Sequence, residues 1–146
     1  MRTFTGAVLI VMLVSLTLTG CVERQVVDVC PKSGGLLIDS TDVLYVKQVL
    51  ADTAKAYDLE SQKLVSADMI GSYEGGKTGT FSAGLVFILL WQYTNPNRLE
   101  LDISGPTPVG ASALSRRIFR EVKAKLITHF GSDRVRDQSK AVLSPI

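Results

Sequence analysis

The chain has two features whose residue types could perform chemistry, and the first is a glycine-rich segment. Gly71-Ser72-Tyr73-Glu74-Gly75-Gly76-Lys77-Thr78 has the spacing of a Walker A motif, which wraps the phosphates of a nucleotide. That motif requires a strand before it and a helix after it, because loop amides and the helix N-terminus hold the phosphates. Residues 80–93 instead have strand periodicity, and Glu74 would place a negative charge beside the phosphates. The segment therefore favours a hairpin turn over 74–79, and we expect no nucleotide at Lys77.

The second feature is His129, the only histidine of the chain. On a helix it lies three residues after Leu126 and seven after Val122, which places it within an apolar arc. A lone histidine in such an arc is typical of a packed residue, although an enzyme that uses it as a base stays an alternative. One histidine and two cysteines offer no zinc-type ligand set, so neither a metal nor a cofactor is predicted.

The start of the chain has the pattern of a secretory signal. Arg2 precedes an apolar run from Gly6 to Leu18. The run is about a dozen residues long, too short to cross a hydrocarbon core of about 30 Å as an ordinary helix. It ends in Leu18-Thr19-Gly20-Cys21, which resembles the lipobox of bacterial prolipoproteins at all four positions.

This resemblance implies a location and an anchor for the protein, but no activity. It implies cleavage between Gly20 and Cys21, after which Cys21 is the mature N-terminus and carries lipid. Val22 is not the Asp that favours inner-membrane retention in such proteins, so the resemblance implies the outer membrane, facing the periplasm, if the source has one. The alternative is an uncleaved signal anchor. Both interpretations place the rest of the chain outside the cytoplasm, because Arg2 is the only charge before Glu23.

The chain length and net charge limit the number of domains and the kinds of partner that we expect. Removal of residues 1–20 leaves 146 − 20 = 126 residues, enough for one domain with a modest core. We interpret residues 21–35 as a lipidated tether and residues 36–146 as a single domain with a weakly ordered C-terminal tail. Without Arg2, Lys and Arg fall from 16 to 15 against 14 Asp and Glu, so no nucleic-acid partner is expected.

The charges are unevenly distributed along the chain. Acidic residues predominate from Cys21 to Ser104, and basic residues predominate from Ser115 onward. This asymmetry favours attraction between two parts of one domain over a partner-binding patch. The candidate basic patch consists of Arg116, Arg117, Arg120 and Lys123.

Cys30 has no second cysteine to pair with if Cys21 carries lipid, and we interpret it as a free, sheltered thiol, with an intermolecular bridge as the alternative.

Hydrophobic periodicity predicts the elements of the domain. In chain order they are a helix from 39–42 to 58, a strand over 63–73, a strand over 80–93, a turn over 94–97, a strand over 98–104 and a helix from 112 or 113 to 130. The second helix has an apolar arc of Leu114, Ile118, Phe119, Val122, Leu126 and Phe130. The strand over 98–104 alternates cleanly, with Leu99, Leu101 and Ile103 inward.

These elements predict an α+β fold. Its core would be a small antiparallel sheet, a three-stranded meander with one or two added edge strands, and two amphipathic helices would pack on one face. In the strand over 80–93, Val86, Ile88 and Leu90 point away from a longer apolar row at the odd positions. They would form an exposed apolar patch on the uncovered face, the mark of a partner surface, unless another segment covers them.

The sequence thus favours a membrane-anchored envelope lipoprotein that acts as a non-catalytic binding or assembly module with an envelope protein partner. Two alternatives stay open. A membrane-tethered enzyme using His129 requires a cleft that places this residue beside a carboxylate. A carrier of a small apolar ligand requires a closed apolar cavity.

Overall fold

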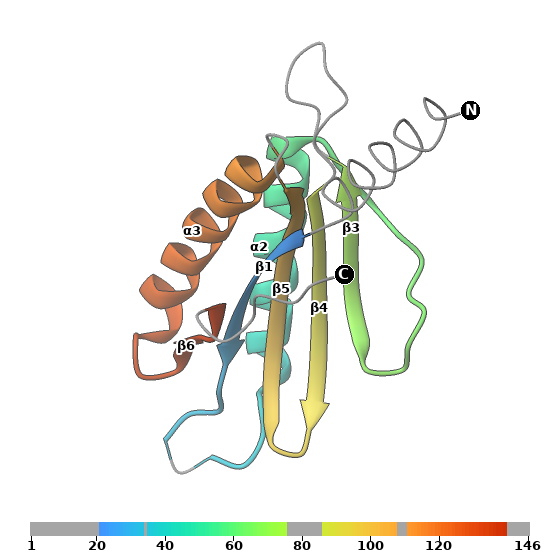
Figure 1. Cartoon of the computed structure of the whole chain (residues 1–146). Helices are drawn as coiled ribbons and strands as arrows, with labels where there is room; N and C mark the ends of the chain where they lie inside the picture. Colours follow the sequence, from blue (N-terminus) through green and yellow to red (C-terminus); the bar gives the residue numbers. More distant parts are fainter. Residues whose placement is uncertain (1–20, 34, 76–85, 108–110, 140–146) are drawn as a thin grey trace, which may run out of the picture.

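The computed structural model describes residues 21–33, 35–75, 86–107 and 111–139. These residues form an α+β fold with one six-stranded antiparallel sheet and two helices (Figure 1). In chain order the elements are β1 (Cys21–Val29), α2 (Ser40–Tyr57), β2 (Leu59–Ser61), β3 (Met69–Gly75), β4 (Val86–Thr94), β5 (Asn97–Thr107), α3 (Ala111–Phe130) and β6 (Val135–Asp137). The signal segment, including Gly20, lies outside the described residues.

The sheet has the strand order β2-β3-β4-β5-β1-β6. The three expected strands, β3, β4 and β5, are consecutive antiparallel neighbours, as a meander requires. Three further strands extend this meander. Strand β2 pairs with β3 at one edge, while β1 pairs with β5 and β6 pairs with β1 at the other.

The interpretation of residues 21–35 as a tether is wrong for Cys21–Val29. These residues form β1, which lies inside the sheet between β5 and β6. Val27 and Val29 are 0% and 1% exposed in the core. Arg24 and Asp28 lie at alternate positions of β1 and pair with charged residues of β5. From the sequence alone these partners are not known, and the two charges therefore suggest an exposed segment.

Both helices follow the predicted pattern and fill one side of the sheet. Helix α2 ends at Asp58, whose φ of 57° is left-handed. In α3, Ile118, Val122 and Leu126 are at most 1% exposed, as their spacing predicts. Gly131, with φ of 90°, ends that helix and donates from its amide to the carbonyl of Ile127 at 2.8 Å.

The face of strand β4 that packs against the helices is the opposite of the one that the sequence suggests. Val86, Ile88 and Leu90 are each 0% exposed and lie in the core beneath the helices, so their assignment to an exposed partner surface is wrong. The register explains the difference, because cross-strand pairs share a face. Ile88 pairs with Ile103 and Leu90 pairs with Leu101, which joins them to the apolar row of β5.

The first half of the predicted strand over 63–73 is also wrong. Strand β3 begins only at Met69, and the residues before it form an exposed connection in which Val65 is 80% exposed. The short strand β2 lies before this connection and was not expected. The predicted hairpin turn over 74–79 begins at the end of β3, and its residues from 76 lie outside the described residues.

Candidate functional site

One face of the sheet carries neither α2 nor α3, and we call it the open face. Side chains at alternate positions of β4, β5 and β1 form it, because cross-strand pairs share a face. The open face consists of Phe87, Leu89, Trp91 and Tyr93 from β4, Arg98, Glu100, Asp102 and Ser104 from β5, and Arg24, Val26 and Asp28 from β1. It is therefore aromatic and aliphatic on one half and charged on the other.

The charged half contains an open groove of ≈ 800 Å³. Its walls come from β1, β5 and the chain after β6, together with the segment that follows β1 and the turn between β4 and β5. Its lining includes Arg24, Asp28, Cys30, Arg98, Glu100 and Arg136. Cys30 is a partly exposed free thiol, which fits the interpretation of an unpaired cysteine.

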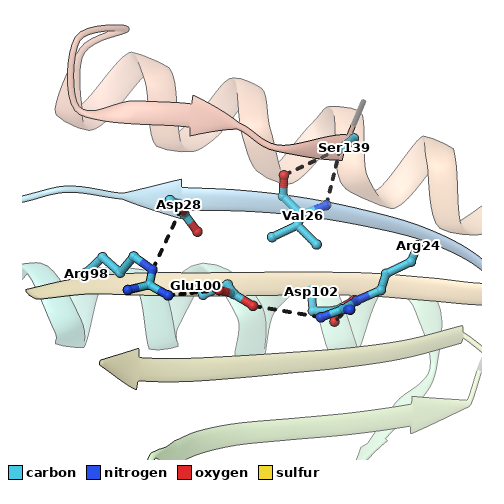
Figure 2. A network of polar contacts seen from close by, with 7 residues as sticks. All are labelled: Arg24, Val26, Asp28, Arg98, Glu100, Asp102 and Ser139. Atoms are coloured by element: carbon cyan, nitrogen blue, oxygen red, sulfur yellow. Dashed lines mark hydrogen bonds and ion pairs between the residues drawn. The ribbon is translucent and has the colours of Figure 1, made fainter. Parts of the chain in front are cut away.

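Figure 2 shows a network of ion pairs between β1 and β5, and all of its charged residues except Asp102 line the groove. Arg98 lies between two carboxylates, with its Nε 3.9 Å from Asp28 Oδ2 and its Nη2 3.6 Å from Glu100 Oε2. Arg24 donates from Nε to Asp102 Oδ2 and has its Nη2 3.8 Å from Glu100 Oε1. The pairs at 3.6, 3.8 and 3.9 Å exceed hydrogen-bond length, whereas Arg98 Nη1 donates to the carbonyl of Pro96 at 3.3 Å.

Two of these carboxylates are buried. Burial raises the pKa of Asp28, and the nearby charge of Glu100 raises it further, against the opposing effect of Arg98. Burial also raises the pKa of Asp102 despite its contact with Arg24. The Oδ1 atoms of both residues are buried without a hydrogen-bond partner among the described residues. The ionised forms of Asp28 and Asp102 are therefore only partly compensated by hydrogen bonds and ion pairs.

The aromatic half of the open face adjoins this network. The rings of Trp91 and Tyr93 stack with centroids 6.1 Å apart. The guanidinium carbon of Arg98 lies 4.5 Å from the centroid of the Tyr93 ring, from the neighbouring strand. Phe87, Leu89, Trp91 and Tyr93 are all partly exposed. A partner could bury apolar surface here and reach the charged groups of β5 at the same time.

The four residues of the predicted basic patch differ in the ion pairs that they form. Arg116 makes a bidentate contact with Glu23, with N–O distances of 2.6 and 2.8 Å. Lys123 Nζ lies 2.8 Å from Asp137 Oδ2. Arg117 Nε lies 3.4 Å from Glu121, and no described residue forms an ion pair with the exposed Arg120. The Arg116–Glu23 pair joins the basic part of the chain to its acidic part, as the charge asymmetry predicts.

The two features that could perform chemistry lie away from the groove. The exposed His129 stacks on the Tyr45 ring, with centroids 3.5 Å apart, and contacts Phe130 edge-on. It therefore packs between rings at the helix surface, whereas the sequence predicts it within the buried arc.

Gly71–Gly75 belong to strand β3 and pair with β4, so this part of the Walker A match forms a sheet ladder. Lys77 and Thr78 lie outside the described residues.

Sequence reasoning missed the partners that make the network. The alternation of residues 98–104 does indicate that Glu100 and Asp102 point away from the core. Their partner Arg24 comes from a strand 78 residues earlier than Asp102, in a segment that the sequence suggests is a tether. Asp28 and Arg98 were missed for the same reason, since only the β1–β5 register places them together.

Within the described ranges, no group of three or more His, Cys, Asp or Glu residues could hold a metal ion. No helix within these ranges has the length and hydrophobicity of a membrane span. No family model, curated protein or solved structure matches the chain.

Proposed function

We propose that the protein is an envelope lipoprotein, anchored through lipid on Cys21, that acts as a non-catalytic module for binding or assembly. In a bacterium with two membranes, it would be held at the outer membrane and face the periplasm. Its binding surface would be the open face of the sheet, where the groove adjoins the aromatic half. The partner would be another envelope protein.

The support for the anchor is the lipobox together with the position of the first strand. Every described helix and strand lies at or after Cys21. Cleavage before Cys21 would therefore leave the described fold intact and place the lipid on its first residue.

The open face is the observation that carries the binding role. The side chains of α2, α3 and the facing strands fill the core. On the other side, four large apolar residues of β4 stay partly exposed beside a charged groove. Apolar surface bordered by charged groups is typical of protein-binding surfaces. His129 packs on Tyr45 rather than in a cleft beside a carboxylate, so the enzyme alternative gains no support.

Site-specific photocrosslinking in intact cells tests the binding role. A photoreactive phenylalanine analogue at Phe87 or Tyr93 on the open face should give a discrete adduct with one envelope protein. The same analogue at Gln48, which is exposed on α2, is the matched control and should not give that adduct. The absence of any protein adduct from the open face, or equal adducts from Gln48, would contradict the proposal.

A further inference from the structure

The two ends of the sheet differ in their distance from the proposed lipid. The Cys21 end contains the start of β1, the end of β5 at Thr107 and the start of α3, because Cys21 pairs with Thr107 (Figure 1). The far end contains the end of β1 at Val29 and the segment that follows it. At the usual rise per residue, the nine residues of β1 span about 27 Å between these ends.

The start of β1 leaves no linker for the anchor. If Cys21 is the mature N-terminus, the residue that carries lipid is itself part of a strand that is paired along its length with β5. The pair between Arg116 and Glu23 further ties this start of β1 to α3. The domain therefore cannot move away from the bilayer surface without unpairing the first residues of β1.

Among the described residues, the exposed charges differ between the two sides of the Cys21 end. On the α3 side, the Arg117 side chain is 65% exposed and Arg120 is exposed. On the opposite edge, Glu60 of β2 pairs in register with Glu74 of β3, and Asp58 precedes them. Anionic headgroups attract the first side and repel the second, and at physiological salt such effects reach about 8 Å. The charges thus favour a tilt that brings α3 towards an anionic surface.

We propose that the lipidated domain is seated directly on the membrane at its Cys21 end, with Arg117 and Arg120 of α3 against anionic headgroups. This inference rests on the proposed lipidation of Cys21. It assigns the membrane surface as the partner of Arg117, whose contact with Glu121 is the longest ion pair of the predicted basic patch, and of Arg120, which forms none with a described residue. The groove, which extends towards the far end, then stays accessible to a protein partner.

Fluorescence quenching from the headgroup layer tests the seating. A fluorophore is attached at Ala113→Cys or Ser132→Cys in a Cys30→Ser background of the lipidated full chain. Both positions are exposed; Ala113 lies in the first turn of α3 and Ser132 just after its end, about 30 Å apart. The protein is reconstituted in vesicles of phosphatidylethanolamine and phosphatidylglycerol that contain a headgroup-spin-labelled lipid. We expect several-fold stronger quenching at position 113 than at position 132.

A pair of charge reversals tests the arginine contact. R117E/R120E should reduce the difference in quenching between the two positions. The matched control K32E/K125E reverses two exposed lysines towards the far end and should leave the difference unchanged. A difference unaffected by R117E/R120E would overturn the arginine contact. Equal quenching at both positions, with lipid present on Cys21 by mass, would overturn the seating while the anchor stands. An unmodified Cys21 would overturn the proposed function and this inference together.

Discussion

The Arg134 guanidinium donates from Nη2 to Asp42 Oδ2 at 2.8 Å, in a pair that is largely buried. Arg134 Nε also donates to the carbonyl of Cys30 at 3.0 Å, and the guanidinium lies 4.9 Å from the centroid of the Phe130 ring. One side chain thus joins the turn after α3 to the start of α2 and to the end of β1. Asp42 is also the acidic residue in the first turn of α2.

Loss of either partner of this pair should destabilise the domain strongly. Arg134→Ala or Asp42→Ala leaves a buried charge without its partner, which costs about 3–5 kcal/mol. Urea denaturation monitored by Trp91 fluorescence measures the free energy of unfolding. The exposed pair of Lys123 and Asp137 is the control, and Lys123→Ala should cost less than about 1 kcal/mol. Equal effects at the two sites would contradict the structural role of Arg134.

The two faces of β4 should respond differently to truncation. Ile88 is fully buried, so Ile88→Ala removes core contacts and should cost about 2–5 kcal/mol. Its neighbour Leu89 is partly exposed on the open face, and Leu89→Ala should cost about 1 kcal/mol. The free energies of unfolding of both variants check this prediction. A larger cost at Leu89 would mean that the odd positions of β4 face the helices.

Asp28 should make the domain less stable as the pH rises. Its folded-state pKa is raised above the ordinary value of 3.8, so the folded state binds more protons than the unfolded state above that pH. The stability that Asp28 contributes is full at low pH and is lost as the pH rises from about 4 through its folded pKa. Asp28→Asn mimics the neutral form. Urea denaturation at several pH values should show the variant gaining stability relative to the wild type as the pH rises. A relative loss would contradict the prediction.

The Walker A match should have no functional consequence. Gly71–Gly75 pair with β4 in the sheet, so their amides are not arranged as a phosphate-binding loop. Calorimetric titration of the purified domain with ATP and Mg²⁺ should show no specific binding, and Lys77→Ala should give the same trace. ATP binding that Lys77→Ala abolishes would contradict this expectation.

Local patterns in the sequence predict part of this fold well. Helices α2 and α3 and strand β5 follow from apolar periodicity, because each packs one face on a single core. The face of β4 could not be predicted, since apolar residues occupy both of its faces and only the pairing of Ile88 with Ile103 decides between them. The groove could not be predicted either, because Arg24 and Asp28 meet Asp102 and Arg98 only through the long-range register of β1 with β5.

The mass of the mature N-terminal peptide tests the lipid anchor most directly. The protein is expressed as its full precursor, recovered from bacterial membranes and digested, and the N-terminal fragment is analysed by mass spectrometry. The proposed lipidation predicts a chain that begins at Cys21 and carries acyl groups, whereas Cys21→Ser should give an unprocessed or released protein. A wild-type fragment that retains residues 1–20, or that begins at an unmodified Cys21, would contradict it.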